Sequence, residues 1–378
     1  MHPSNQAAYL IGPKQRPLEV RSAPYTHPQA DEIVIKNHAV AVNPIDHIKQ
    51  DIGNLLYSWV KYPAILGTDV AGEVVEVGPS VTHFQVGDRV VGNSIGLAEK
   101  HNLPSHCGFQ EYTVLLTKMA SHIPDWLAYE QAAVIPLGLS TAACAMFQED
   151  QLALQYPTVS ASKNSTGKTL LIWGGSTSVG SNAIQLAVAA GYEVITTASP
   201  RNFEYVRKLG AAQVFDYNSS TVIADIKQAF QGKITAGALS VGRGAAEMCL
   251  NILSSCKGDK FLSMATYPMP PSPPKRLVTL QTAFYYISGI VSLSVRARLG
   301  GVRTKFIFGD TLVDNEVGPM IYEEFLPRAL AEKMFVAVPD AEVVGHGLGT
   351  IQHALDVHKG VVSAKKIVVT LGGSVRDQ

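Results

Sequence analysis

A run of glycines and hydroxyl-bearing residues, WGGSTSVG, occupies positions 173–180, between an apolar stretch and a segment with helical periodicity. A strand–turn–helix unit that binds a dinucleotide carries the pattern G-x-G-x-x-G, because the backbone must approach the pyrophosphate closely. Gly175 and Gly180 match the first and third glycines, and Thr177 replaces the second. Hydroxyl groups donate to phosphate oxygens, and the helix N-terminus adds free N–H groups. The turn therefore predicts dinucleotide binding; the alternative is an ordinary strand–turn–helix made of small residues.

The end of the next strand bears on which dinucleotide this would be. A site for NAD places an acidic residue there to bind the ribose 2′-hydroxyl. This chain has no carboxylate from Thr196 to Phe203, and it carries Ser199 and Arg201 instead. A serine and an arginine can bind a 2′-phosphate, which an aspartate would repel. We therefore expect NADP(H), with Arg201 as a solvated residue at a helix start as the alternative.

The elements that position these residues fall into two classes. The first third consists of short β-branched segments separated by turns, which predicts a small all-β barrel or sandwich: 33–35, 38–42, 69–77, 86–91 and 110–116. From residue 169 onward, strands alternate with helices, which predicts an α/β fold with a doubly wound parallel sheet. The expected strands are 169–173, 192–198, 213–217, 236–241, 260–265 and 305–308, and the helices 179–190, 202–209 and 222–230. Helices are also expected at 129–147, 322–333 and 348–358, a strand at 366–371, and a core element at 277–293.

Composition limits the function classes. The 378 residues carry 31 basic and 31 acidic side chains, so no net charge favours nucleic acid or an anionic membrane. We expect neither a signal peptide nor a membrane span. The four cysteines have no CxxC spacing, which favours free thiols and a cytoplasmic location.

Several motifs together resemble the medium-chain dehydrogenase/reductase superfamily. They are NPID at 43–46, LGTDVAGEVV at 66–75, VGDRV at 86–90 and QAAVIP at 131–136 followed by STA at 140–142. The resemblance implies a GroES-like domain from residues 1–140 and 319–378, and a Rossmann domain that binds NADP(H) at 141–318. Zinc alcohol dehydrogenases of this superfamily need a Cys where this chain has Asn43, and a His-Glu pair where it has Thr68-Asp69. The lobe at 96–108 carries only Cys107 of the four cysteines of a structural zinc site, so we expect no metal.

Within this superfamily, the chain resembles the fungal polyketide trans-acting enoyl reductases. The likeness rests on GGST at 174–177, SPRNF at 199–203 and VFDY at 214–217. The group has its lysine one position before Lys49 and reads ALD where this chain reads ALS at 238–240. The resemblance implies cofactor contacts at Asp46, His47, Lys49, Gly175, Ser176, Thr177, Ser178, Val179, Gly180, Ser199, Pro200, Arg201, Asn202, Tyr217, Leu262, Ser263, Ser363 and Ala364.

An enoyl reductase needs an apolar slot, a donor to the enolate oxygen and a proton source. We expect Thr141 to be the donor, and Lys49 or Tyr57 to be the acid; the alternatives are an interfacial tyrosine, a surface or phosphate-binding lysine, and water as the acid. Substrate contacts are expected at Pro136, Ser140, Thr141, Phe284 and Tyr285. The resulting hypothesis is an NADPH-dependent enoyl reductase, monomer or homodimer, acting in trans with a polyketide synthase. The alternatives are a stand-alone quinone or enone reductase and a catalytically silent binding protein.

Overall fold

The computed structural model describes residues 3–55, 57–160, 165–268, 278–360 and 362–371, except for the side chains of 278–280, 282 and 283. The chain forms two units. Unit 1 contains Met1–Leu137 and Val313–Gln378, and unit 2 contains Gly138–Leu312. The sequence places these junctions after residues 140 and 318.

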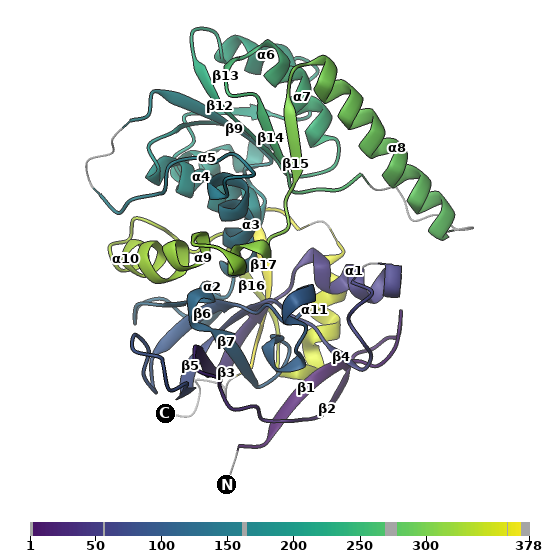
Figure 1. The fold of residues 1–378 in the computed structure, drawn as a ribbon, viewed down its shortest axis with the longest axis vertical. Coiled ribbons are helices and arrows are strands. Elements are labelled where there is room, and N and C mark those ends of the chain that lie inside the picture. Colours follow the sequence, from purple (N-terminus) through teal and green to yellow (C-terminus); the bar gives the residue numbers. More distant parts are fainter. Residues whose placement is uncertain (1–2, 56, 161–164, 269–277, 361, 372–378) are drawn as a thin grey trace. The chain divides into compact units, whose positions relative to one another are not determined.

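Unit 2 is built on a parallel sheet in the order β11-β10-β9-β12-β14-β15, with β13 paired to β12 (Figure 1). This is the 3-2-1-4-5-6 order of a Rossmann sheet, so the predicted α/β doubly wound fold is confirmed. The strands are β9 (Lys168–Trp173), β10 (Glu193–Ala198), β11 (Gln213–Asp216), β12 (Ile234–Ser240), β13 (Lys257–Gly258), β14 (Phe261–Met264) and β15 (Arg303–Phe306). Parallel strands covered on both faces are mostly apolar, and β9 is apolar from Leu170 to Trp173 and buried from Thr169 onward.

The helices of unit 2 follow the strands as crossover connections. They are α4 (Ser178–Ala189), α5 (Phe203–Lys208), α6 (Val222–Ala229), α7 (Ala245–Ser255) and α8 (Val278–Leu299), and α3 (Pro136–Phe147) begins at the junction of the units. The helix expected over 129–147 is interrupted, because Pro136 starts a new helix. By length and composition alone the stretch 129–147 would pass for a membrane span, but 78% of its apolar window is buried, as in a core helix.

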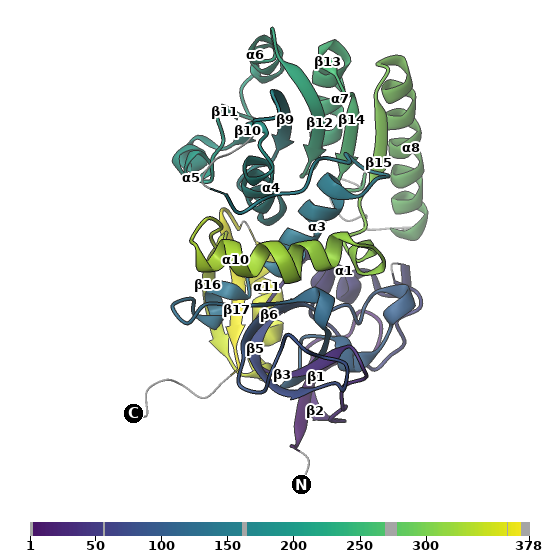
Figure 2. The same ribbon diagram turned by 60° about the vertical axis from the view of Figure 1, so that its left-hand side comes forward.

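Helix α8 corrects the expectation of a core element at 277–293. In both views it runs beside β15 along the edge of the sheet (Figure 1, Figure 2). Leu293 and Ala297 are buried, but Phe284 is 70% exposed and Ile287 is 61% exposed. The segment is apolar on two faces, and only one of them packs against unit 2.

Unit 1 contains a seven-stranded sheet in the order β16-β17-β3-β5-β6-β8, with β7 paired to β3, and a three-stranded sheet β2-β1-β4. The larger sheet consists of β3 (Glu32–Ala41), β5 (Asp69–Val77), β6 (Arg89–Asn93), β7 (Tyr112–Leu116), β8 (Ala120–His122), β16 (Asp340–His346) and β17 (Lys365–Thr370). The smaller one consists of β1 (Asn5–Leu10), β2 (Glu19–Ala23) and β4 (Ala64–Ile65). The segments expected at 33–35 and 38–42 therefore belong to one strand. Strands β16 and β17 come from the end of the chain, and β17 pairs with β3.

The helices of unit 1 lie between these strands. They are α1 (Pro44–Ile52), α2 (Tyr129–Ala132), α9 (Val317–Pro319), a π-helical segment (Met320–Phe325), α10 (Leu326–Ala331) and α11 (Ile351–His358). Helix α11 contacts both α1 and β17. All four cysteines are buried free thiols, as expected.

Candidate functional site

The turn at 173–180 connects β9 to α4 at the carboxyl edge of the sheet of unit 2. Its first residues are held to the neighbouring strand, since Gly174 N donates to Thr197 Oγ1 at 3.0 Å and Gly175 N donates to the Thr197 carbonyl at 2.9 Å. Thr177 is the N-cap of α4: its Oγ1 accepts from Gly180 N at 3.0 Å and donates to the Gly174 carbonyl at 2.7 Å. The hydroxyl proton of Thr177 is therefore used inside the turn. This corrects the expectation that it donates to a phosphate.

The glycines of this turn are required by close packing. A Cβ at Gly180 would lie 2.2 Å from the Gly174 carbonyl oxygen, and one at Gly175 would lie 2.2 Å from Thr196 Oγ1. The first N–H groups of α4 have no partner within the helix. Ser178 Oγ is buried and has no hydrogen-bond partner among the described residues. An orphaned hydroxyl beside free N–H groups fits the pyrophosphate of a dinucleotide.

The next two strands bring a second group of predicted residues to the same edge. Ala198 pairs with Asp216 in the β10–β11 ladder, so Ser199 and Tyr217 follow neighbouring strand ends. Arg201 is exposed and forms no ion pair among the described residues, and Tyr217 is 46% exposed. Pro200 is exposed too, whereas Asn202 is buried and its Nδ2 donates to Ser199 Oγ at 3.2 Å. The edge therefore presents a hydroxyl, a guanidinium, a phenol and the carboxylate of Asp216, whose Oδ1 accepts from Asn218 N at 2.9 Å.

Other predicted residues of unit 2 are not at this edge. Leu262 and Ser263 are fully buried in β14, and Ser263 Oγ donates to Gln151 Oε1 at 2.9 Å. Their side chains therefore belong to the core, and their expected cofactor contacts stay predictions. On α3, Ser140 is fully buried and Thr141 is half-buried, beside Gly309.

Lys49 and Tyr57 are brought together in unit 1. The side chain of Lys49 is fully buried, and its Nζ donates to the Tyr57 carbonyl at 2.9 Å and to the Gly53 carbonyl at 3.3 Å. Its ammonium lies 5.1 Å from the centre of the Tyr62 ring, and burial lowers its pKa. The interpretation of Lys49 as a surface residue is wrong. Its ammonium is enclosed and holds the loop that carries Tyr57. Its expected roles as acid and as cofactor contact stay predictions.

Asp46 also has a structural role. It is fully buried, with Oδ2 accepting from Asn43 N at 2.8 Å and Oδ1 accepting from Gly67 N at 3.0 Å. Burial raises its pKa to about 7, although both backbone amides favour the ionised form. Oδ2 fixes the start of α1 and Oδ1 ties it to Gly67, before β5, so the carboxyl group has a structural role. Its expected cofactor contact stays a prediction.

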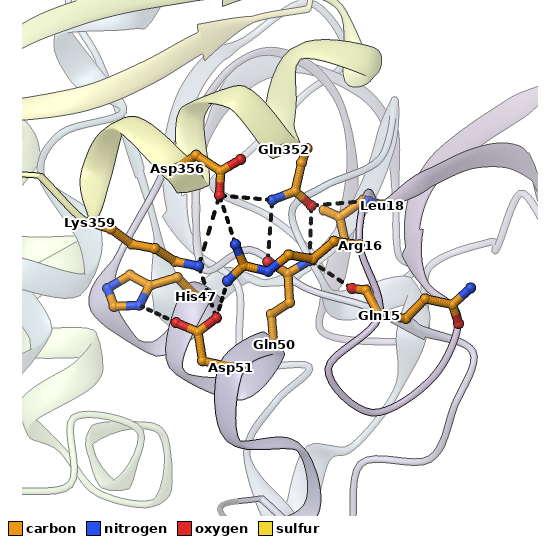
Figure 3. A network of polar contacts seen from close by, with 9 residues as sticks. All are labelled: Gln15, Arg16, Leu18, His47, Gln50, Asp51, Gln352, Asp356 and Lys359. Carbon is orange, nitrogen blue, oxygen red and sulfur yellow. Dashed lines mark hydrogen bonds and ion pairs between the residues drawn. The ribbon is translucent and has the colours of Figure 1, made fainter. Parts of the chain in front are cut away.

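His47 lies at the margin of a polar network between α1 and α11 (Figure 3). Its Nδ1 is 3.7 Å from Asp51 Oδ2, and Asp51 also forms ion pairs with Arg16 and Lys359. Its ring is 5.3 Å from that of His358, whose pKa is lowered to about 4 chiefly by burial. The network ties α1 to α11 and includes His47, whose expected cofactor contact stays a prediction.

Three further predicted residues lie elsewhere in unit 1. Pro136 is buried and its carbonyl accepts from Tyr322 Oη at 3.1 Å. Ser363 and Ala364 lie just before β17, and Ala364 adopts a left-handed backbone with φ of 51°. As cofactor and substrate contacts, these three residues stay predictions.

The structure reveals one polar centre that we did not predict. Lys366 on β17 is 4% exposed, and its Nζ donates to Asp69 Oδ2 at 2.9 Å and to Asn43 Oδ1. Asn43 Nδ2 donates to Thr68 Oγ1 at 3.0 Å and to Asp69 Oδ2 at 2.9 Å. Asp69 Oδ1 accepts from Leu137 N at 2.7 Å, at the start of α3. A buried ion pair thus joins β17, β5 and the α3 start.

This centre occupies the positions where zinc dehydrogenases carry their catalytic ligands. The donor set does not suit Zn²⁺, which prefers Cys sulfur and His nitrogen, and the Lys366 ammonium already neutralises Asp69. Among the described residues, no group of three or more His, Cys, Asp or Glu side chains could hold a metal ion. The lobe at 96–108 is instead held by the side-chain amide of Gln110, which donates to the carbonyls of Pro104, Ser105 and Cys107.

Comparison with known proteins places these features in a family. Residues 29–125 match the family described as alcohol dehydrogenase GroES-like domain, and residues 178–273 match the one described as zinc-binding dehydrogenase. The chain is 55% identical to the dehydrogenase pigH of Monascus ruber, over 98% of this chain and 100% of that protein. It belongs to the medium-chain dehydrogenase/reductase superfamily. Unit 1 is accordingly its GroES-like domain and unit 2 its Rossmann domain.

Other relatives of this superfamily carry more specific names. The trans-enoyl reductase himH of Aspergillus japonicus is 38% identical, over 98% of both chains. The structure of the CurK enoyl reductase superposes with a TM-score of 0.69 at 18% identity, covering 97% of this chain and 99% of that chain. A quinone oxidoreductase from Coxiella burnetii superposes with a TM-score of 0.66 at 23% identity, covering 98% of this chain and 100% of that chain. The protein is thus an oxidoreductase of this superfamily with relatives named enoyl reductase, and the fold implies a nicotinamide cofactor.

Proposed function

We propose that the protein is an NADPH-dependent reductase of conjugated C=C bonds that works without zinc, on an acyl chain carried by a polyketide synthase. The observation that carries the cofactor choice is the end of β10, where Ser199 and Arg201 follow the strand and no carboxylate stands between Thr196 and Phe203. The name of the himH relative, trans-enoyl reductase, supports the substrate class. The side chains around Lys366 are poor ligands for Zn²⁺, which supports a reaction without zinc.

In this proposal, different residues bind the cofactor and assist the reduction. The turn from Gly175 to Gly180 and the N-terminus of α4 bind the pyrophosphate, with Ser178 Oγ as an added donor. Ser199 and Arg201 bind the 2′-phosphate, and Tyr217 borders the adenosine end. When bound, NADPH supplies the hydride. Thr141 donates a hydrogen bond to the carbonyl oxygen as it gains negative charge. Tyr57 is the candidate acid for the α-carbon, since the ammonium of Lys49 is enclosed.

Oxidation of NADPH in the presence of a crotonyl thioester tests the substrate class, with a small quinone as the competing substrate. Turnover of the thioester with saturated acyl product supports the proposal, and turnover of the quinone alone would replace it with a quinone reductase. If NADPH neither turns over nor raises the melting temperature, the cofactor assignment fails, because a ligand that binds the native state must stabilise it.

The variant Ser199→Asp tests the 2′-phosphate site. We expect it to lower kcat/KM for NADPH at least tenfold while sparing NADH, since the new carboxylate repels a phosphate and accepts from a 2′-hydroxyl. Ser219→Asp, which adds the same charge at a loop position after β11, is the matched control. Equal losses for both cofactors would remove Ser199 from the site.

A further inference from the structure

Charge is unevenly distributed between the two units. Residues 138–312, which form unit 2, contain 16 Lys and Arg and 9 Asp and Glu, so their formal charge is +7. The remaining residues contain 15 Lys and Arg and 22 Asp and Glu, which gives −7. A charge asymmetry of this size within a neutral chain favours an anionic partner for the basic part.

Cations gather at the amino edge of the unit 2 sheet. Lys168, Lys257 and Arg303 are the first residues of β9, β13 and β15. Lys233 directly precedes β12, and Lys260 directly precedes β14. Because these strands are parallel, all five residues lie along the same edge. The cofactor site that we propose is at the opposite edge, about 20 Å away along the six residues of β9, so the cofactor does not account for these cations.

One of the five cations serves a helix end. Lys260 Nζ donates to the Ser254 carbonyl at 2.7 Å in the last turn of α7, where the backbone is electronegative. Lys168 and Lys257 differ from it, because both are exposed and neither ammonium has an ion-pair or hydrogen-bond partner among the described residues. Their charges are therefore available to a partner.

These two lysines flank an exposed isoleucine. Ile234 begins β12, and its ladder partners are Lys168 in β9 and Lys257 in β13. The side chain of Ile234 is large and apolar, yet the residue is 43% exposed. We call Ile234, Lys168 and Lys257 the Ile234 patch. An apolar side chain inside a charged rim is the arrangement of a protein contact surface.

We propose that the Ile234 patch docks an acidic surface of a partner protein. The identity of that partner rests on the proposed function, in which it is the protein that carries the acyl chain. Carboxylates of the partner pair with Lys168 and Lys257, and an apolar side chain between them packs on Ile234. Docking at the amino edge leaves the carboxyl edge of unit 2 free for the cofactor.

Carboxylates along the same edge favour a protein over a uniformly negative surface. Glu193 pairs with Lys233 at 2.6 Å, and Asp259 pairs with Arg303 at 2.9 Å. A membrane of anionic lipid or a nucleic acid backbone would meet these carboxylates together with the lysines, and like charges brought together are unfavourable. A folded acidic surface can direct its carboxylates to the Ile234 patch alone.

Fluorescence anisotropy with a designed peptide tests the surface. The probe is a labelled amphipathic helix of about 20 residues that presents Glu side chains around one Leu. We expect the wild type to bind it with an affinity that falls as salt is raised, because the charges in contact are exposed. Lys168→Glu/Lys257→Glu should weaken binding at least about tenfold, since carboxylates would then face carboxylates. Lys36→Glu/Lys61→Glu, which changes the net charge equally at two exposed lysines of unit 1, is the matched control.

A charge-reversed peptide, with Lys in place of each Glu, separates a lost contact from a lost fold. The unit 2 double variant should bind this peptide and the wild type should not, because complementary charge sets the preference. A wild type that does not bind the acidic peptide, or a unit 1 control that loses binding equally, would overturn the proposal. Equally tight binding of phosphatidylcholine–phosphatidylserine vesicles or duplex DNA, lost in the same double variant, would identify a general polyanion surface and overturn it too.

Turnover of the crotonyl thioester separates this inference from the proposed function. We expect Lys168→Glu/Lys257→Glu to reduce the free thioester at the wild-type rate, because both lysines lie at the edge opposite the cofactor. A loss of turnover in this variant would mean that the patch belongs to the active site, and the proposal would fail. Turnover without peptide binding would remove the docking surface and keep the function. Peptide binding without turnover would remove the function and keep the acidic docking surface.

Discussion

Removing the Lys366 ammonium should substantially lower the free energy of unfolding of unit 1. In Lys366→Met the stem of the side chain is kept, but Asp69, which is fully buried, loses its only cation in the described structure. Removing one partner of a buried ion pair typically costs about 3–5 kcal/mol, because the remaining charge is uncompensated. The hydrogen bonds from Leu137 N and Asn43 Nδ2 remain, so we expect about 3 kcal/mol, the lower end of that range.

A second substitution should recover most of this loss. In Lys366→Met/Asp69→Asn the centre is neutral, and Oδ1 of the new asparagine still accepts from Leu137 N. The loss of Lys366 also frees Asn43 Oδ1, so that the Asn43 amide can turn and accept from the new side-chain amide. We expect the double variant to lie within about 1–2 kcal/mol of the wild type, since an ion pair removed as a whole is often nearly neutral.

The assay is urea unfolding of the wild type, both single variants and the double variant, followed by circular dichroism. The double-mutant cycle isolates the coupling between the two side chains. Lys366→Arg, which keeps the charge, is the control for the change in shape. If the two single losses simply add in the double variant, the ion pair is not the source of the stability, and the reasoning fails.

Three further predictions concern the turn and the buried titratable groups. Thr177→Ala should cost about 0.5–2 kcal/mol of unfolding free energy, measured in urea, because α4 loses its N-cap. Asp46 should make the native state less stable as pH rises from about 4 to about 7, because its raised pKa lets the native state keep a proton that the unfolded chain has lost. Asp46→Asn should remove this contribution to the pH dependence of the unfolding free energy, and an unchanged pH dependence would contradict the prediction. His358 should have the opposite effect between about pH 4 and about pH 6.5, where the unfolded chain binds a proton that the buried imidazole does not; unfolding of His358→Gln over the same range checks the sign.

The elements of the Rossmann domain could be predicted because their signals are local. The turn chemistry at Gly174 and Gly175, the alternation of short apolar runs with helical periods, and the closing Gly191 all lie within a few residues of the boundaries they set. The apolar residues on two faces of α8 led us to predict a core element at 277–293, and this prediction was wrong. Periodicity shows that a face is apolar, but it does not show that another element covers that face.

The polar centre at Lys366 could not be predicted, because nothing local marks it. Asn43 and Asp69 attracted attention only as replacements for zinc ligands, and Lys366 reads as an ordinary charged residue beside a terminal strand. Only the pairing of β17 with β3 brings the end of the chain to its first third and places the ammonium between these two side chains. The role of Asn43 and Asp69, at positions where zinc dehydrogenases have metal ligands, therefore depends on Lys366, a residue distant in the sequence.

Thr177 shows how the turn we propose as the pyrophosphate site can accommodate a side chain at the second glycine position. In the glycine pattern the second glycine matters because it has no side chain near the phosphates. Here the side chain is present, but it turns inward, caps α4 and bonds the Gly174 carbonyl, so it takes little space on the side where a pyrophosphate would lie. In the site we propose, the phosphate contacts are then left to backbone N–H groups and to Ser178 Oγ, which is buried without a partner among the described residues. On this reasoning Thr177→Gly should weaken the turn's own stability more than its affinity for NADPH.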